Sequence, residues 1–258
     1  MVPEQHGFAV TWKGTGNTVA LVPSMLSLFR GKKNKLQGIS EKASIFEVPY
    51  VVVDTELTGL NETKDSIVSI GGVRMIGGRI ELGNTFYRLV SPRTALSAES
   101  VVIHEITPSE VKAEPGIESV LDDFLAFCAD AILVGHFVSI DMNFLNREIL
   151  RTGRAAISNP VIDTYSIYEW LRKRNLPHAC FEISPDAYRL FDIVKCFGIP
   201  VNGAHNAFKD AFATAQLLQR FLPLLSEAGV SDIKDLLRRG TPFKGGDSFK
   251  LTNEFCNF

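Results

Sequence analysis

Hydrophobic residues follow a regular pattern from residue 48 onward, and this pattern predicts an alternation of strands and helices. Short apolar runs indicate strands at 48–53, 67–76, 85–90, 131–135 and 161–163. Apolar positions that recur every three or four residues indicate helices at 97–103, 117–128, 142–151, 164–173, 188–197 and 207–225. The first three strands adjoin, whereas the later strands alternate with helices. This order predicts an α/β fold with a mixed sheet.

The same pattern divides the chain into three segments. Residues 48–225 form the predicted main domain. Residues 1–47 are predicted to be an N-terminal extension with a short amphipathic helix, because Val22, Met25, Leu26 and Phe29 fall on one helical face. Residues 226–258 are predicted to hold one more helix, at 230–239, and a tail without periodicity.

Composition limits which partners, cysteine-based sites and cellular locations we expect for the protein. A formal net charge of -2 excludes a basic field over the whole protein as the means of attracting nucleic acid. The four cysteines, at 128, 180, 196 and 256, contain no C-x-x-C pair, which fits neither a zinc site nor a dense disulfide framework. No run reaches the roughly 18 to 20 apolar residues that span a bilayer. We therefore expect a cytoplasmic protein that does not enter a membrane.

Two acidic residues stand at the end of the first predicted strand. Asp54 and Glu56 are two positions apart, so their side chains share one face of an extended chain. Two carboxylates on one face repel each other unless a cation lies between them, which indicates a divalent metal site. The alternative is a polar strand end that runs into a turn, and an isolated D-x-E pattern usually has that meaning.

Three more polar residues lie at the ends of predicted elements. Asp141 opens the helix that follows the strand 131–135, where an N-cap aspartate is the common alternative. Asp210 lies in the first turns of the helix 207–225, where an acidic residue complements the helix dipole. His205 precedes that helix on a loop, where a histidine is usually a solvated side chain. Each alternative is reasonable alone, but together they do not explain why all five residues stand in order within local sequences that match known motifs.

The local sequences around these residues resemble the three motifs of a known enzyme family. The segments are Asp54-Thr55-Glu56-Leu57-Thr58-Gly59-Leu60, His136-Phe137-Val138-Ser139-Ile140-Asp141 and His205-Asn206-Ala207-Phe208-Lys209-Asp210-Ala211. They are similar to the motifs of the DEDD 3′–5′ exonucleases, histidine subclass, which include the epsilon subunit of bacterial DNA polymerase III and ribonuclease T-like exonucleases. The resemblance covers roughly residues 48–225. It implies a ribonuclease H-like, mixed five-stranded sheet flanked by helices.

The resemblance also implies catalytic roles. Asp54, Glu56, Asp141 and Asp210 would bind two divalent metal ions, Mg²⁺ or Mn²⁺, with Asp54 bridging both. His205, with a reference pKa of about 6.5, would be the general base that takes a proton from the attacking water. Two divalent ions suit phosphodiester hydrolysis, because they activate the nucleophile and stabilise the departing 3′ alkoxide.

Substrate contacts are expected in two places. In the family, the segment that corresponds to Leu57, Thr58 and Gly59 receives the 3′-terminal nucleotide. Leu57 departs from the family's usual Thr and is a candidate wedge against the terminal base. Phe137 stands where the family usually carries Asn and is a candidate for stacking on bases, since aromatic faces bind single strands without demanding sequence. Phe144 is a further candidate, although core packing is favoured for it.

A second departure in the same motif is Ile140, which stands where the family usually carries Phe. The acidic residue of this motif, Asp141, is intact, so the departures concern substrate handling more than catalysis. Asp163 follows the last predicted strand, and we expect a buried, hydrogen-bonded residue there rather than a further metal ligand.

The sequence therefore predicts a metal-dependent 3′–5′ exonuclease that hydrolyses single-stranded ends, DNA favoured, to nucleoside 5′-monophosphates in proofreading or repair. One alternative is an exoribonuclease or oligoribonuclease of the same family, because nothing places a group near Leu57 to meet the 2′-hydroxyl. Another is a non-catalytic nucleic-acid-binding or polymerase-docking module, although none of the motif residues is lost. The expected partners are a nucleic acid with a free 3′ end and a DNA polymerase or another replication or repair protein.

Overall fold

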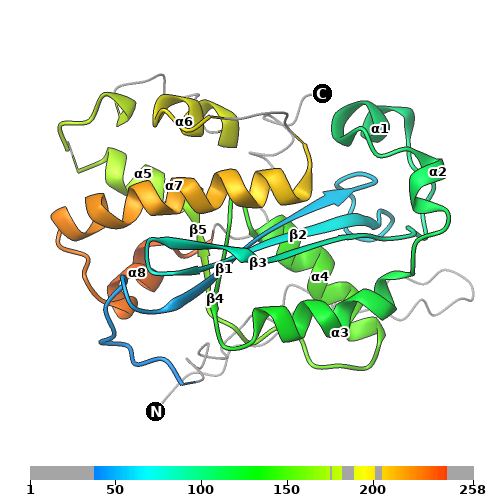
Figure 1. The fold of residues 1–258 in the computed structure, drawn as a ribbon, viewed down its shortest axis with the longest axis horizontal. Helices are drawn as coiled ribbons and strands as arrows, with labels where there is room; N and C mark the ends of the chain where they lie inside the picture. Colours follow the sequence, from blue (N-terminus) through cyan, green and yellow to red (C-terminus); the bar gives the residue numbers. More distant parts are fainter. Residues whose placement is uncertain (1–37, 175, 182–188, 201–204, 243–258) are drawn as a thin grey trace, which may run out of the picture. The chain divides into compact units, whose positions relative to one another are not determined.

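One five-stranded sheet forms the centre of the fold. The computed structural model describes residues 38–174, 176–181, 189–200 and 205–242. In this part of the chain the strand order is β3-β2-β1-β4-β5, and helices flank both faces of the sheet (Figure 1). The α/β class and the mixed sheet are thereby confirmed. The predicted helix within residues 1–47 and the tail beyond residue 242 lie outside the described residues.

The sheet combines antiparallel and parallel pairing. The strands are β1 (Pro49–Leu57), β2 (Ile67–Ile76), β3 (Arg79–Leu89), β4 (Ile132–Gly135) and β5 (Val161–Asp163). β1 pairs antiparallel with β2 and parallel with β4, β2 pairs antiparallel with β3, and β4 pairs parallel with β5. Because β1 and β4 are parallel, the end of β1 and the segment after β4 meet at the same edge of the sheet. That edge carries Asp54 and Glu56, which β1 holds near its C-terminal end.

Helices follow the predicted order, and all of the predicted helices except the one at 117–128 have shifted ends. They are α1 (Ala98–His104), α2 (Pro108–Val111), α3 (Ile117–Cys128), α4 (Ser139–Arg151), α5 (Thr164–Arg172), α6 (Leu190–Cys196), α7 (Ala207–Glu227) and α8 (Ile233–Arg239), with the 3₁₀ helix η2 (Ala179–Phe181) before α6. α2 and η2 were not predicted, because elements of four and three residues are too short to show a period. Within the described residues, no helix combines the length and apolar character needed to cross a membrane.

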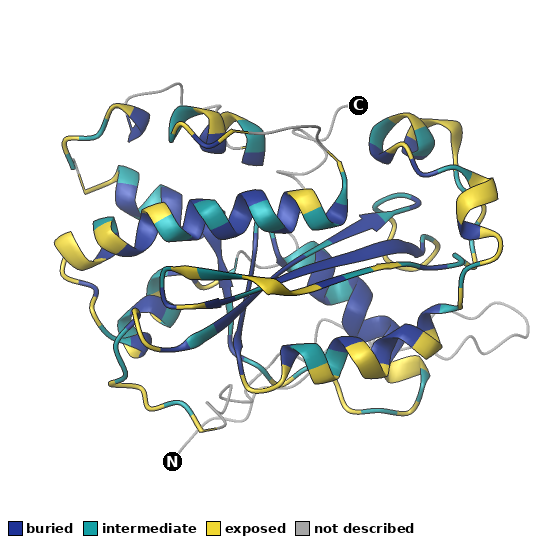
Figure 2. Ribbon diagram, in the orientation of Figure 1, coloured by how far each residue is buried: buried dark blue, intermediate teal, exposed yellow. Residues whose placement is uncertain are grey.

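Two apolar clusters cover the two faces of the sheet. Tyr50 and Val52 of β1 pack with α5, α6, α7 and α8, whereas Val51 and Val53 pack with α3 and α4. This division follows from the alternation of side chains along a strand. Because both faces are covered, β1 and β2 are buried along most of their length, while the edge strand β3 is largely exposed (Figure 2).

Residues on either side of the predicted domain boundaries pack into this core. Ile45 is fully buried, and its N–H donates to the backbone oxygen of Ser231 at 3.1 Å. Ile233 and Leu236 of α8 are also fully buried in the cluster that contains α7. The described residues before 48 and α8 therefore belong physically to the same core as residues 48–225.

One disulfide departs from what the cysteine pattern suggested. Cys180 of η2 and Cys196 of α6 are joined, while Cys128 is free and buried. The two cysteines are 16 positions apart, a spacing that carries no local signature. A single bridge is not the dense framework that the sequence excluded. It nevertheless removes the support that cysteine usage gave to a reducing compartment.

A glycine allows the start of α7 to lie directly on β2. A Cβ atom on Gly71 would lie 2.1 Å from the backbone oxygen of Ala207 and 2.5 Å from the backbone nitrogen of Phe208. Both contacts are with backbone atoms, which cannot swing aside as the tip of a side chain can. The missing side chain thus sets how closely the first turn of α7, which includes Asp210, approaches the sheet.

We expect Gly71→Ala to lower the free energy of unfolding by about 1 to 3 kcal/mol, because the added methyl group must push α7 away from β2. Gly83→Ala in β3 is the matched control, since no heavy atom lies within 4 Å of a Cβ there. Chemical denaturation of both variants measures the difference. Equal midpoints for the two variants would show that α7 does not depend on this close approach.

Candidate active site

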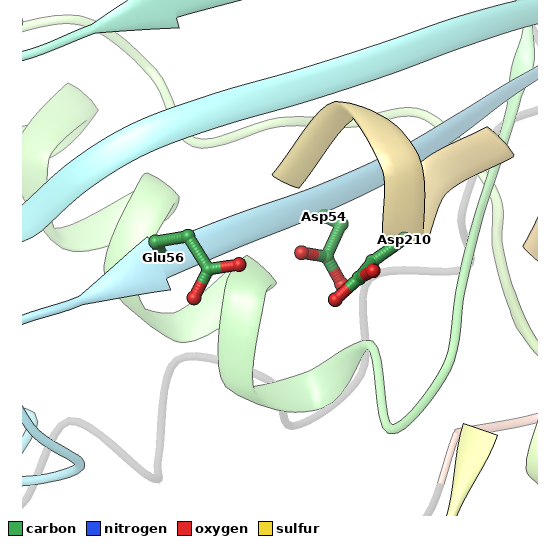
Figure 3. A group of neighbouring side chains, drawn as sticks. All are labelled: Asp54, Glu56 and Asp210. Atoms are coloured by element: carbon green, nitrogen blue, oxygen red, sulfur yellow. The ribbon is translucent and has the colours of Figure 1, made fainter. Parts of the chain in front are cut away.

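Three carboxylates meet at the C-terminal end of β1. Asp54 and Glu56 project from the same face of β1, and Asp210 reaches them from the first turn of α7 (Figure 3). One oxygen from each carboxylate lies within 4.8 Å of the other two. Oxygen ligands of Mg²⁺ or Ca²⁺ lie about 2.0 to 2.6 Å from the ion, so ligands of one ion lie within about twice that distance of each other. The three side chains can therefore hold a divalent cation.

Burial and mutual repulsion disfavour the charged forms of these carboxyl groups. Burial, followed by the charges of Asp210 and Asp141, raises the pKa of Glu56 to about 8. Burial raises the pKa of Asp210 to about 7, and burial and the neighbouring carboxylates hold the pKa of Asp54 well above its usual range. Asp210 Oδ1 is buried without a hydrogen-bond partner among the described residues. A cation would neutralise the cluster and give this oxygen a partner, so the donor set fits a metal ion.

Asp141 lies beside this group of three rather than within it. α4 begins at Ser139, so Asp141 stands in its first turn and is not the residue before the helix. Its Oδ1 accepts a hydrogen bond of 2.6 Å from the hydroxyl of Thr55, which lies between the two acidic residues of β1. Asp141 is buried, and burial raises its pKa to about 7. Its charge in turn raises the pKa of Asp54 and of Glu56, so these acidic residues interact electrostatically.

His205 meets the cluster through its backbone. Its N–H donates to Asp210 Oδ2 at 3.1 Å, and its φ of 60° lies in the left-handed region. The imidazole is accessible and its centroid is 5.9 Å from the ring of Phe191. Partial desolvation lowers the pKa of His205 below its ordinary value. The structure thus places His205 next to a cluster residue, in surroundings that favour the neutral imidazole.

The loop after β1 uses two of the predicted substrate residues for its own structure. Thr58 is buried, and its Oγ1 donates to Asp65 Oδ1 at 3.2 Å and accepts from the Ser66 N–H at 3.0 Å. A Cβ on Gly59 would lie 2.6 Å from Asp65 Oδ2, so any other residue at this position would have to displace the carboxylate. Leu57 follows a register shift in the β1–β2 pairing and is half-buried against the cluster under α4. Of the three residues, Leu57 has the side chain with surface left for a substrate.

Phe137 occupies the segment between β4 and α4. Its φ is 54°, its N–H donates to Asp163 Oδ1 at 3.1 Å, and its ring centroid lies 4.8 Å from that of His136 and 4.6 Å from that of Tyr165. Asp163 also accepts the Tyr165 N–H and is 1% exposed, which confirms the buried, hydrogen-bonded role expected for it. Phe144 is fully buried, as core packing predicts.

Two residues near the cluster have no sequence signal that marks them. The Tyr87 hydroxyl of β3 accepts a hydrogen bond of 3.4 Å from Asn206, and its pKa is raised by burial and, to a smaller extent, by the charge of Glu56. His104 ends α1 and is buried, and its Nε2 has no hydrogen-bond partner among the described residues. Its pKa is lowered mainly by burial and in part by His205. A tyrosine in an edge strand and a histidine at a helix end are common features, so only the tertiary packing places them here.

Comparisons with known proteins agree with this geometry. Residues 51–218 match the family described as exonuclease. The DNA polymerase III subunit epsilon of Aquifex aeolicus is 29% identical over 211 residues, which cover 80% of this chain and 96% of that protein. The PolC-type DNA polymerase III of Halalkalibacterium halodurans is 32% identical over 186 residues, which cover 72% of this chain and 12% of that protein. This chain therefore spans a small part of the PolC-type relatives and nearly all of the epsilon relative.

Solved structures show the same fold. Exonuclease X in complex with 5′ overhanging duplex DNA has a TM-score of 0.53 and 25% identity, and the likeness covers 73% of this chain and 99% of that one. Escherichia coli exonuclease I in complex with a dT13 oligonucleotide has a TM-score of 0.61 and 17% identity, with coverage of 71% and 43%. The second likeness supports the fold alone. Because the family match covers most of the chain and includes every residue of the acidic cluster, this chain belongs to the exonuclease family.

Proposed function

We propose that this protein is a metal-dependent 3′–5′ exonuclease that releases nucleoside 5′-monophosphates from single-stranded ends. The observation that carries this proposal is the convergence of Asp54, Glu56 and Asp210, with one buried oxygen of Asp210 that has no hydrogen-bond partner in the described part of the chain. A carboxylate cluster that is unfavourable without a cation is suited to bind one. Membership of the exonuclease family supports the reaction class.

The metal ligands are assigned from this geometry. Asp54, Glu56 and Asp210 would hold one Mg²⁺ or Mn²⁺ ion, since hard cations prefer oxygen ligands. Asp54 and Asp141 would hold a second ion, a proposal that the electrostatic coupling of these two residues supports. When bound, the ions supply activation of water and stabilisation of the departing 3′ alkoxide.

His205 is proposed as the general base. Its lowered pKa keeps an imidazole nitrogen free to accept the proton of the attacking water at neutral pH. The backbone N–H of His205 donates to Asp210 and orients its carboxylate. His205 would therefore position a metal ligand with its backbone and accept a proton with its side chain. The exposed imidazole can reach water at the mouth of the site.

DNA is the favoured substrate in this proposal. The side chain of Leu57 offers no polar atom to a 2′-hydroxyl, and the hydroxyl of Thr58 is already bonded within the loop. Leu57 would contact the terminal base, Gly59 and Thr58 would keep that loop in shape, and Phe137 would stack on a base. The DNA complex of exonuclease X and the epsilon relative support this choice. A polymerase or another replication or repair protein as partner, and a cytoplasmic location, are part of the same proposal.

The decisive experiment measures degradation of 3′-labelled single-stranded DNA, RNA of the same sequence, and duplex with a recessed end, in Mg²⁺ or Mn²⁺. We expect nucleoside 5′-monophosphates from single-stranded DNA, with a slower reaction on RNA. Asp210→Ala should abolish hydrolysis, because it removes a ligand from the buried cluster. Asp123→Ala, which changes an exposed aspartate of α3, is the matched control and should retain full activity.

Other outcomes of this assay would contradict the metal assignment or favour another function. Wild-type turnover by Asp210→Ala would contradict the metal assignment. Faster hydrolysis of RNA would favour the exoribonuclease of the same family. Oligonucleotide binding that is unchanged by chelator, without degradation of any end, would favour a non-catalytic binding module.

We expect His205→Ala to reduce kcat by about 10²-fold or more, the range typical of a lost general base. Binding of Mn²⁺ should be retained, since the metal ligands are unchanged. The pH–rate profile should lose the acidic limb that reports protonation of this imidazole. If the variant keeps the wild-type profile, His205 is not the base.

The stability of the metal-free protein should fall as the pH rises. The pKa of Glu56 is raised to about 8 and those of Asp141 and Asp210 to about 7, so the folded state favours their protonated forms. Their contribution is therefore fully present below about pH 4, where unfolded carboxyl groups titrate, and is lost as the pH rises through about 7 to 8. In excess chelator, Tm should decrease from pH 5.5 to pH 8.

Added Mn²⁺ should reverse this trend, because it binds the folded state and competes with protons for the same carboxylates. The increase in Tm on adding Mn²⁺ should be larger at pH 8 than at pH 5.5. Asp210→Asn is the control variant, and its Tm should depend less on pH. A metal-free Tm that rises over this range would contradict the proposed electrostatics of the cluster.

A further inference from the structure

The loop at residues 58–66 joins β1 to β2, and Asp65 closes it from within. Asp65 Oδ1 accepts from the hydroxyl of Thr58 at 3.2 Å, and Oδ2 accepts from the Asn61 N–H at 2.7 Å. The same carboxyl group fills the space beside Gly59 where a Cβ would otherwise fit. The path of the chain directly after the acidic pair of β1 therefore depends on where Asp65 is held.

Arg147 of α4 holds this loop from outside. Its Nη2 donates to the backbone oxygen of Asp65 at 2.7 Å, and its Nη1 donates to the backbone oxygen of Glu62. The Arg147 side chain is 9% exposed, and both hydrogen bonds to the loop are partly buried. Asn143, one turn earlier on α4, donates to Glu62 Oε1 at 2.6 Å. α4 thus forms hydrogen bonds with the loop at two residues, Glu62 and Asp65.

The guanidinium of Arg147 is fixed on its other edge as well. Its Nε and Nη2 donate to Oε1 of the buried Glu148 at 2.9 and 2.6 Å, and its Cζ lies 4.8 Å from the ring centre of Phe144. Arg93 and Arg151 approach the same carboxylate at 3.5 and 2.8 Å. A planar group bound on two edges has one orientation, which a flexible ammonium would not have.

Arg147 lies on α4, the same helix that carries the acidic residue Asp141. Asp141 stands in the first turn of the same helix, so the helix that presents this carboxylate also positions the loop. The hydrogen bonds of Arg147 within the described part of the chain go to the loop and to Glu148, and none goes to the acidic cluster. Loss of Arg147 would therefore release the loop while the carboxylates keep their places.

We propose that Arg147 is a positioning residue for the substrate, which acts through Asp65 to set the course of Leu57, Thr58 and Gly59 for the 3′-terminal nucleotide. The inference rests on the proposed function, because it assumes that this segment receives the substrate end. It goes further by assigning nucleotide placement to a residue outside all three sequence motifs.

The test compares Arg147→Met with wild type on two substrates in Mn²⁺. One is a single-stranded oligodeoxynucleotide, and the other is bis(p-nitrophenyl) phosphate, which carries no nucleoside and reports the metal centre alone. Arg147→Met should raise KM for the oligonucleotide about tenfold or more, because the end is misplaced, and change kcat by less than about threefold. Its rate on the small diester should stay within about twofold of wild type.

Arg151→Met is the matched control. Arg151 lies one turn further on α4 and pairs with the same carboxylate of Glu148, but its side chain is 41% exposed and its hydrogen bond is to Glu148 rather than to the loop. It should leave both substrates within about twofold of wild type, the range expected where no substrate contact is lost. Equal kinetics for the two variants, or an equal loss of both substrates in Arg147→Met, would overturn the proposal.

Two further variants test the positioning role of Arg147 if Arg147→Met does not fold. Asp65→Asn keeps the shape of the side chain but weakens its bonds within the loop, so it should show the same selective rise in KM. Arg147→Lys should recover part of the oligonucleotide affinity, since an ammonium can still reach one carbonyl. Normal KM in Asp65→Asn would contradict the proposal, and failure of wild type on both substrates would overturn the proposed function itself.

Discussion

Repulsion among carboxylates buried at the end of β1 is the constraint on which the rest of the structure depends. Three like charges within 4.8 Å are unfavourable in a site shielded from water, so the fold must hold them together by packing elsewhere. The two apolar clusters on the faces of the sheet supply that packing, and Gly71 lets α7 come close enough to bring Asp210 in. Packing thus holds the carboxylates together against their electrostatic repulsion. A cation bound between them would relieve that repulsion.

Regular elements could be predicted from the sequence wherever the apolar period ran through the whole element. β2, α3 and β5 have the predicted bounds; both ends of β2 and of α3 coincide with the ends of an apolar pattern, and β5 ends at the acidic residue that follows its two apolar residues. α4 begins three residues before the predicted start. Its first turn, Ser139 to Asp141, has one apolar residue between two polar ones, so the apolar period does not show where the helix begins. The boundary was misplaced because Asp141 in this turn is bonded to the Thr55 hydroxyl and adds no apolar side chain to the pattern.

The acidic residues of the site could be predicted from local motifs, but their contacts could not. Nothing in the spacing of Asp54 and Asp210 shows that they meet, because the approach depends on α7 lying across β2. The hydrogen bond from Thr55 to Asp141 and the grip of Arg147 on the loop join residues more than 80 positions apart. An arginine in a helix usually indicates a solvated face. Only the packing of α4 against the loop shows that this one is buried.

Two of the departures from the family motifs, Leu57 and Phe137, differ in physical kind. Leu57 changes the surface of the loop and leaves its internal bonds intact, because Thr58 and Asp65 supply those bonds. Phe137 replaces an Asn that tolerates a positive φ better, and left-handed backbone costs about 1 to 2 kcal/mol for such a residue. Its ring contact with Tyr165 returns about 0.5 to 1.5 kcal/mol, a comparable amount. The ring contact between Phe137 and Tyr165 is therefore comparable in free energy to the cost of the left-handed backbone at Phe137. The case that Phe137 meets the substrate rests on its place before the helix of Asp141 and not on its backbone conformation.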